Sequence, residues 1–91
     1  MRLDIFLKLS RLCPRRSVAQ QLCDAGRVLL NGRPAKSAHL VKPGDEITIR
    51  RLDRETIARV AAVPSSHNVA RNESKQLIEV LGSRELGVDN Q

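Results

Sequence analysis

The sequence predicts one small α+β domain, in which a hairpin of two helices packs on a small antiparallel sheet. The length of 91 residues leaves room for a single core. Apolar residues recur at helical spacing up to Gly26, and apolar and polar residues alternate after it. One more helix is expected near the C-terminus. We therefore expect two helices, at least three short strands and a last helix, in that order.

The first helix is predicted over residues 3–12. Its inward positions follow the spacing i, i+3 and i+4, at Leu3, Phe6 and Leu7. Cys13 and Pro14 then interrupt the pattern. Proline lacks a backbone N–H and disfavours helix in the residue before it, so the break is expected near Cys13. Pro14 suits the first turn of the following helix.

The second helix is predicted over residues 15–25, with Gly26 as its stop. Its inward residues are Val18, Ala19, Leu22, Cys23 and Ala25. The break between the two helices is short. The pair is therefore expected to form a helical hairpin.

Strands are predicted after Gly26. Residues 27–30 have the composition of a short strand, and Asn31-Gly32 is a strong two-residue turn signal. Pro43 and Gly44 suit the central positions of a type II turn. Residues 46–50 alternate strictly, and residues 56–63 are expected to pair with them in antiparallel fashion.

The chain after residue 63 is expected to differ in character. Residues 64–68 are typical of a linker, and Leu77, Ile78 and Leu81 indicate a last helix that ends at Gly82. Residues 83–91 are expected to be frayed. This divides the chain into a domain over residues 1–63 and a linker with a C-terminal helix and tail over residues 64–91.

The charge is concentrated at the front of the chain. Residues 1–54 hold 12 Lys and Arg against 5 Asp and Glu, a balance of +7, whereas residues 55–91 hold 4 against 5, a balance of −1. Charge that only solubilises a protein usually mixes both signs evenly. The asymmetry therefore indicates a polyanionic partner, either nucleic acid or a membrane surface.

The aromatic content restricts how a nucleic acid would be held. Phe6 is the one Phe, Tyr or Trp residue of the chain. Domains that bind single strands usually stack bases on several exposed rings, which this composition excludes. We expect recognition through phosphates, 2′-hydroxyls and shape, with arginine as the main ligand.

The sequence contains no set of residues typical of an enzyme. Cys13 and Cys23 lack partners at metal-ligand spacing, and His39 and His67 both fall in predicted loops. Glycine-rich phosphate-binding motifs are absent from the sequence. We therefore predict a protein without catalytic residues, metal or cofactor, in which both cysteines are buried, reduced thiols.

The N-terminus bears on localisation. Arg2, Asp4 and Lys8 interrupt what would have to be the apolar region of a signal peptide. No apolar run approaches the roughly 20 residues that span a bilayer. The sequence thus predicts a cytoplasmic protein without a membrane partner.

The candidate binding residues lie in the helical hairpin. Lys8, Arg11, Arg15 and Arg16 fall on the first helix and at the start of the second, where free N–H groups of a helix terminus also favour an anion. As a surface contact, Arg16 is expected to be removable with little change in melting temperature. Arg33, Arg50 and Arg51 are expected to be ordinary surface charges.

Several linked motifs resemble a known family. The opening MRLDIFLKLSRL, the run Arg15-Arg16-Ser17-Val18-Ala19, the segment AGRVLLNGRPAK and the segment VKPGDEI are similar to the RNA-binding S4 domain, which is named after a small-subunit ribosomal protein. The likeness covers about residues 1–60. It implies an αL-like fold whose two-helix face binds structured RNA. The positions that match the family are Arg2, Asp4, Arg15 and Arg16, with Lys8 and Arg11 nearby. Together with Lys36, these are the residues that we expect to bind RNA.

Within that family, the chain is most similar to stand-alone members of bacterial ribosome quality control. This implies a monomer that binds large-subunit RNA and peptidyl-tRNA after a stalled ribosome has split, while a partner factor adds a C-terminal tail to the nascent chain. Ile5 and Pro14 depart from the family pattern, which has basic residues there. The acidic balance of the tail differs from the basic extension of the related fifteen-kilodalton heat-shock protein.

Other functions are weighed against this one. The chain resembles, at greater distance, factors that recycle large subunits in the manner of that heat-shock protein. It also fits a general module for structured RNA. The RNA-binding module of a modifying enzyme would need a catalytic domain, which this sequence lacks. A basic adaptor for an acidic protein or membrane surface would need a long amphipathic helix, which the sequence lacks.

Overall fold

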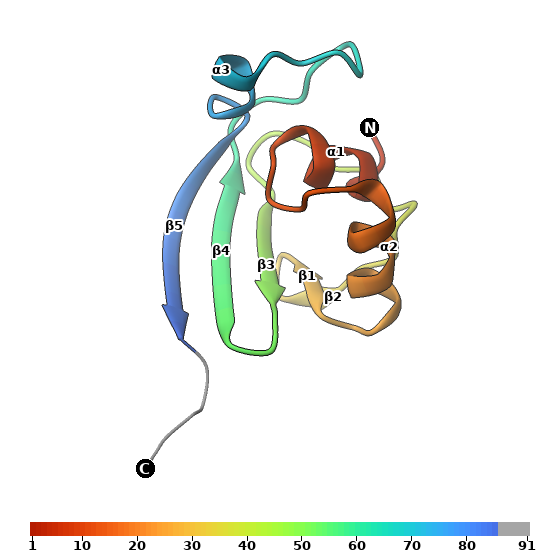
Figure 1. The fold of residues 1–91 in the computed structure, drawn as a ribbon, viewed down its shortest axis with the longest axis vertical. Coiled ribbons are helices and arrows are strands. Elements are labelled where there is room, and N and C mark those ends of the chain that lie inside the picture. Colours follow the sequence, from red (N-terminus) through yellow and green to blue (C-terminus); the bar gives the residue numbers. More distant parts are fainter. Residues whose placement is uncertain (86–91) are drawn as a thin grey trace.

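The computed structural model describes residues 1–85, in which a twisted antiparallel sheet carries two helices on one face (Figure 1). The strands lie in the order β2-β1-β3-β4-β5. The elements in chain order are α1 (Leu3–Leu9), α2 (Arg16–Asp24), β1 (Val28–Leu30), β2 (Arg33–Pro34), β3 (Glu46–Arg50), β4 (Arg54–Val60), α3 (Arg71–Ser74) and β5 (Ile78–Glu85). The predicted α+β class and the helical hairpin on an antiparallel sheet are confirmed.

The first helix is shorter than predicted. It ends at Leu9, because Arg11 adopts a left-handed conformation with φ of 64°. The Cys13 N–H then donates a hydrogen bond to the Leu7 carbonyl at 3.0 Å. An Arg51 terminal nitrogen donates to the Leu12 carbonyl at 2.6 Å. A side chain from the far end of β3 therefore holds the turn that the local sequence had suggested to be helix.

The second helix agrees with the prediction to within one residue at each end. Arg15 is its extended N-cap, and Gly26 follows its end with φ of 74°. We had expected Pro14 in the first turn of this helix. It lies just outside that turn instead, because it precedes the N-cap. The helix stops as predicted because only glycine adopts this conformation without a steric penalty.

The strands after Gly26 pair as the alternation predicts. In β1 and β3, Val28 is opposite Ile49 and Leu30 is opposite Ile47, all on the face that meets the helices. The Asp45 N–H donates to the Lys42 carbonyl at 3.1 Å and Gly44 has φ of 94°, as a type II turn requires. β4 pairs antiparallel with β3 over five residues, but it spans Arg54–Val60, where residues 56–63 had been expected.

The core lies between this sheet face and the helical hairpin. Leu3, Phe6 and Leu7 of α1 are fully buried, and they pack in one cluster with Val28 and Ile47 of the sheet. The one Phe, Tyr or Trp ring of the chain therefore belongs to the core. Phe6 cannot stack on a ligand in this fold.

The C-terminal helix is the main error of the prediction. Residues 78–85 form strand β5, which pairs antiparallel with β4 from Val60 opposite Ile78 to Arg54 opposite Glu85. The register shifts by one residue between Ile57 and Ala58, whose partners are Gly82 and Val80. Leu81 is the extra residue of this bulge. This extra residue interrupts the alternation of a strand, so that Leu77, Ile78 and Leu81 happen to have helical spacing. Pairing with β4, and not the local spacing, decided the conformation of the segment.

The segment before β5 folds back against the domain. Leu77 is 6% exposed and belongs to the main core, and its carbonyl accepts the Ala61 N–H at 2.8 Å. At the short helix α3, Ser74 accepts a hydrogen bond from Arg11 Nε at 3.2 Å. Of the tail that we expected to be frayed, residues 83–85 belong to β5 and residues 86–91 lie outside the described part of the chain.

Candidate nucleic-acid interface

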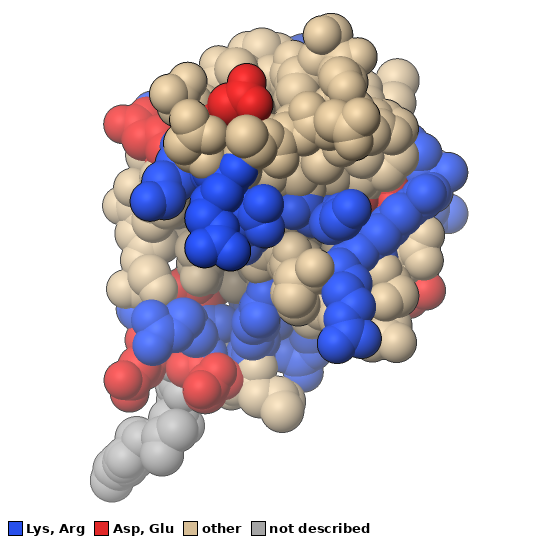
Figure 2. Space-filling view, turned by 45° about the horizontal axis from the view of Figure 1, so that its top comes forward, with Lys and Arg blue, Asp and Glu red and all other residues tan. Residues whose placement is uncertain are grey.

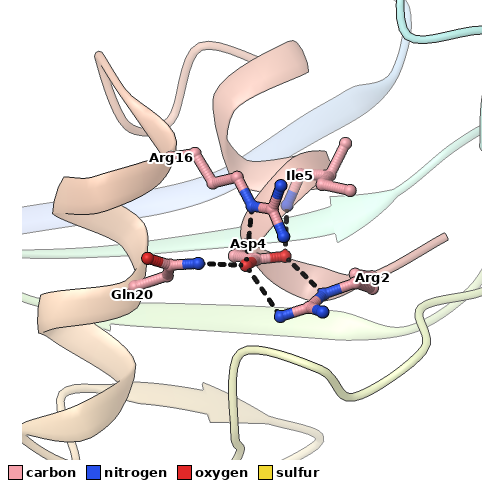
Figure 3. Close-up of polar contacts among 5 residues, drawn as sticks. All are labelled: Arg2, Asp4, Ile5, Arg16 and Gln20. Carbon is pink, nitrogen blue, oxygen red and sulfur yellow. Dashed lines mark hydrogen bonds and ion pairs between the residues drawn. The ribbon is translucent and has the colours of Figure 1, made fainter.

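A fully buried carboxylate, Asp4, organises the basic residues of the helical hairpin (Figure 3). Arg16 Nε donates to Oδ2 of Asp4 at 3.0 Å, and Gln20 Nε2 donates to the same oxygen at 2.9 Å. Arg2 Nε and one terminal nitrogen of Arg2 each reach a carboxylate oxygen at 3.2 Å. The Ile5 N–H donates to Oδ1 at 2.8 Å. One acid thus joins the start of α1 to the first two turns of α2.

The pKa of Asp4 is set by two opposing effects. Burial raises it, because a charged carboxylate loses its hydration. The hydrogen bonds from Gln20, Arg16, Arg2 and the Ile5 N–H act in the opposite direction and together hold the pKa below its ordinary value of 3.8. Asp4 is therefore ionised at neutral pH, and it balances two guanidinium groups that are about half exposed.

Asp4 was expected among the residues that contact RNA, and the structure gives it a different place. Its side chain has no exposed surface. It can act on a ligand only by orienting Arg2 and Arg16. The sequence could not show this, because the burial of Asp4 depends on α2 lying across α1.

Three of the expected residues have exposed side chains with no ion pair to any acid within residues 1–85. These are Lys8 on α1, Arg11 in the turn and Arg15 at the N-cap of α2. Figure 2 shows Lys and Arg side chains gathered in a band across one face of the molecule. Their charge is available to a ligand, and we call Lys8, Arg11, Arg15 and Arg16 the basic hairpin surface.

Lys36 lies apart from these residues, in the loop between β2 and β3. It is exposed, and the next residue, Ser37, accepts the Asp4 N–H at 3.2 Å. The His39 carbonyl in the same loop accepts the Leu3 N–H at 2.7 Å. Lys36 therefore stands beside the N-terminal end of α1, next to the Asp4 cluster.

Most of the arginines on the sheet are held by structural partners. Glu55, 5% exposed, accepts hydrogen bonds from Arg50 at 2.7 Å and from Arg84 at 3.1 Å. The hydrogen bond from Arg50 is the largest cause that lowers the pKa of Glu55. Arg59 forms an ion pair with Glu79 at 3.2 Å, and Arg51 donates a hydrogen bond to the Leu12 carbonyl. Arg50 and Arg51 were expected to be ordinary surface charges, but both donate hydrogen bonds to structural partners.

Two adjoining surface depressions lie beside the basic hairpin surface. The larger, of about 370 Å³, is lined by Ile5, Lys8, Leu9, Pro14, Arg15, Arg16, Ser17 and His67. The smaller, of about 280 Å³, is lined by Lys8, Leu9, Arg11, Cys13, Pro14, His67, Asn68 and Val69. Sequence reasoning assigned no role to His67 or Asn68. Only the return of the chain after β4 brings them to the hairpin.

The arrangement suits the binding of a polyanion. Exposed guanidinium and ammonium groups converge on one surface, and charge-assisted hydrogen bonds to phosphate are short and strong. Within residues 1–85, no group of three or more His, Cys, Asp or Glu side chains is placed to hold a metal ion, and no helix is long and apolar enough to cross a membrane. Both cysteines are buried free thiols, as predicted.

Comparison with known proteins places these features in a family. Residues 1–47 match the family model of the S4 domain. The RQC P-site tRNA stabilizing factor of Bacillus subtilis (strain 168) is 38% identical over 87 residues, which cover 96% of this chain and 99% of the relative. The protein of the same name from Halalkalibacterium halodurans is 41% identical over 80 residues, covering 88% of this chain and 89% of the relative.

Solved structures show the same fold. Heat Shock Protein 15 of Vibrio cholerae, solved as a trimer, superposes with a TM-score of 0.77 at 30% identity and covers 88% of this chain and 80% of that chain. The solution structure of the hypothetical protein HP1423 gives a TM-score of 0.78 at 34% identity, with 90% of this chain and 98% of that chain covered. The chain therefore belongs to the S4 domain family, and within it to the group that contains the RQC P-site tRNA stabilizing factors.

Proposed function

We propose that this protein is a non-enzymatic RNA-binding factor of bacterial ribosome quality control. It binds the large ribosomal subunit that carries obstructed peptidyl-tRNA, contacts ribosomal RNA and tRNA, and supports C-terminal tailing of the nascent chain by a partner factor. It acts as a monomer in the cytoplasm, without a cofactor. The observation that carries the proposal is the basic hairpin surface, in a chain that matches relatives named for P-site tRNA along almost its whole length.

The contacts of Arg16 explain how the surface would hold RNA. Arg16 uses Nε on Asp4, and no hydrogen bond within residues 1–85 occupies its two terminal nitrogens. A guanidinium fixed at one edge loses less conformational entropy when its other edge binds a phosphate. Asp4 therefore serves as a positioning residue, and the free edge of Arg16 serves as the contact.

Lys8, Arg11 and Arg15 would add sequence-independent phosphate contacts around this fixed group. Such contacts fix register and orientation on folded RNA without reading its bases. This agrees with a partner recognised by its shape. Arg2 and Lys36 extend the same surface around the N-terminus of α1.

A second candidate is the recycling of large subunits in the manner of Heat Shock Protein 15. It is favoured by the structural similarity to the Vibrio cholerae protein. The two candidates differ in what must be on the ribosome. A tRNA-stabilising factor should prefer subunits with P-site tRNA, whereas a general binder of ribosomal RNA should not distinguish them.

The test is sedimentation of the purified protein with large subunits, either empty or carrying peptidyl-tRNA, at fixed salt. We expect the peptidyl-tRNA complex to retain more protein. The double variant Lys8→Ala/Arg15→Ala should lose binding in both cases. Arg59→Ala is the matched control, because Arg59 is paired with the exposed Glu79 on the sheet. Equal retention by both subunits would support the second candidate, and no retention would overturn the proposal.

A further inference from the structure

The two depressions beside the hairpin adjoin each other. They share Lys8, Leu9, Pro14 and His67, and we call the joined feature the linker groove. Its near wall is the α1–α2 hairpin, and its far wall is the segment of residues 67–69 that follows β4. A volume of about 370 Å³ in the larger part lies within the range of pockets that hold small organic groups.

The lining of the groove combines two kinds of chemistry. Ile5, Leu9 and Pro14 give it an apolar floor, while Lys8 and Arg15 provide cations at the rim. An apolar floor is unsuited to a phosphate alone. An apolar floor beside cations is suited to a nucleotide, whose base is flat and apolar on its faces and whose phosphate is charged.

His67 supplies the one exposed aromatic ring of the groove. Phe6 is fully buried, so the remaining rings that can stack on a base belong to the two histidines. His67 is exposed and lines both parts of the groove, whereas His39 lines a separate depression beside β2. Imidazole rings stack on unpaired bases in RNA-binding proteins.

The far wall is fixed in place by the rest of the fold. Val69 packs against the main core, two residues after His67. Arg11 Nε donates to Ser74 Oγ at 3.2 Å, and the Ser74 hydroxyl donates to the Arg71 carbonyl at 2.7 Å. The turn between α1 and α2 is thus hydrogen-bonded to α3, which follows the segment of residues 67–69 in the chain.

We propose that the linker groove binds one unstacked nucleotide of the RNA partner. The base lies between His67 and the apolar floor, and its phosphates meet Lys8 and Arg15 at the rim. This rests on the proposed RNA-binding function and deepens it, because it adds contact with a base to a surface that otherwise holds only phosphates. It also assigns a role to the chain beyond residue 63.

The test compares two short probes that carry the same number of phosphates. One is a single-stranded RNA pentamer, and the other is an abasic pentamer of the same backbone. Binding to the full chain is followed by fluorescence anisotropy and by the NMR signals of the His67 and His39 ring protons. We expect the RNA pentamer to bind about fivefold or more tightly than the abasic one, the lower end for stacking on one ring. The His67 ring protons should shift upfield, and those of His39 should not.

Variants separate stacking from charge. His67→Ala should abolish the preference for the RNA pentamer, and His67→Phe should preserve it, because phenylalanine keeps a stacking ring without a nitrogen. His39→Ala is the matched control and should behave as wild type. Equal binding of the two pentamers, or a His67→Ala variant that keeps the preference, would overturn the inference. Sedimentation of wild-type protein with large subunits tests the proposed function separately, so that the two ideas can fail independently.

Discussion

Arg16 donates from Nε to the buried Oδ2 of Asp4 at 3.0 Å, while 47% of its own side chain remains exposed. One arginine therefore closes the α1–α2 hairpin and also presents a guanidinium to solvent. Stability and binding are linked at this residue. This alters what mutation of the basic surface is expected to do.

Arg16→Ala should lower both stability and ribosome binding. Removing the guanidinium leaves the buried Asp4 with fewer donors, which we expect to cost about 1–2 kcal/mol, less than for a fully buried charged pair because Arg16 is half exposed. For a domain of this size, that corresponds to a fall of roughly 4–15 °C in melting temperature. Thermal unfolding followed by circular dichroism measures it.

Arg15→Ala provides the control. Arg15 is exposed and has no ion pair within residues 1–85, so its removal should weaken sedimentation with large subunits and leave the melting temperature unchanged. The earlier expectation that Arg16 could be removed without a change in melting temperature would be restored if the two variants melted together.

Asp4→Asn should weaken the dependence of the free energy of unfolding on pH in the acid range. The folded-state pKa of Asp4 is below 3.8, so its ionised form stabilises the fold above about pH 3.8, and this stability is lost as the pH falls through the folded value. The asparagine cannot titrate, and at pH 7 we expect a loss of about 1–3 kcal/mol. Urea unfolding between pH 2.5 and 7 would show the two curves converging in acid. Asp45 also has a lowered pKa, so some acid dependence should remain. If the free energies of unfolding of wild type and Asp4→Asn ran parallel over this pH range, the ionised Asp4 would not stabilise the fold as described.

The salt dependence of RNA binding should report the number of phosphate contacts. With about five contacts, log K against log salt should fall with a slope of roughly −4. Lys8→Ala should reduce the magnitude of the slope by about 0.7–0.9, the effect of one phosphate contact. Arg59→Ala should leave the slope unchanged. Filter binding to a large-subunit RNA fragment between 50 and 300 mM salt, a range over which counterion release is readily measured, gives all three slopes. An affinity independent of salt would exclude phosphate-driven binding.

The cysteines should be unreactive in the folded protein. Burial raises the pKa of both the Cys13 and the Cys23 thiols, which suppresses the reactive thiolate. Maleimide labelling should therefore appear only with unfolding. Cys23→Ser should cost about 1–3 kcal/mol of stability if its hydroxyl finds no partner, with unchanged RNA affinity of the folded fraction. Rapid labelling under native conditions, or weaker RNA binding by fully folded Cys23→Ser, would contradict a packing role.

Leu77→Ala should show that the C-terminal segment belongs to the folding unit. Leu77 is 6% exposed and packs in the main core, so truncation should cost about 2–3 kcal/mol. Leu52→Ala is the matched control, since Leu52 is 89% exposed, and it should change stability by less than about 0.5 kcal/mol. A chain that ends at Val63 should melt below the full chain, because it loses Leu77 and leaves β4 without β5. If that short chain melted like the full protein, residues 1–63 would be an independent domain.

The sequence by itself determined the helical hairpin, the strands β1, β3 and β4 and the general place of the basic surface. Each of these depends on local chemistry: the spacing of Leu3, Phe6 and Leu7, the left-handed stop at Gly26, and the turn at Pro43 and Gly44. A residue's own neighbours in the chain suffice to impose these conformations. The resemblance to the S4 domain rested on the same segments.

Only the tertiary structure decided the burial of Asp4, the identity of β5 and the position of His67. Asp4 is buried because Arg16 and Gln20 approach it from another helix, and nothing next to Asp4 in the chain indicates this. Residues 78–85 became a strand because the edge of β4 was available and a bulge at Leu81 could absorb the broken alternation. His67 reached the hairpin through the packing of Val69 and Leu77. All three depend on contacts between residues far apart in the chain, whose energies local spacing does not contain.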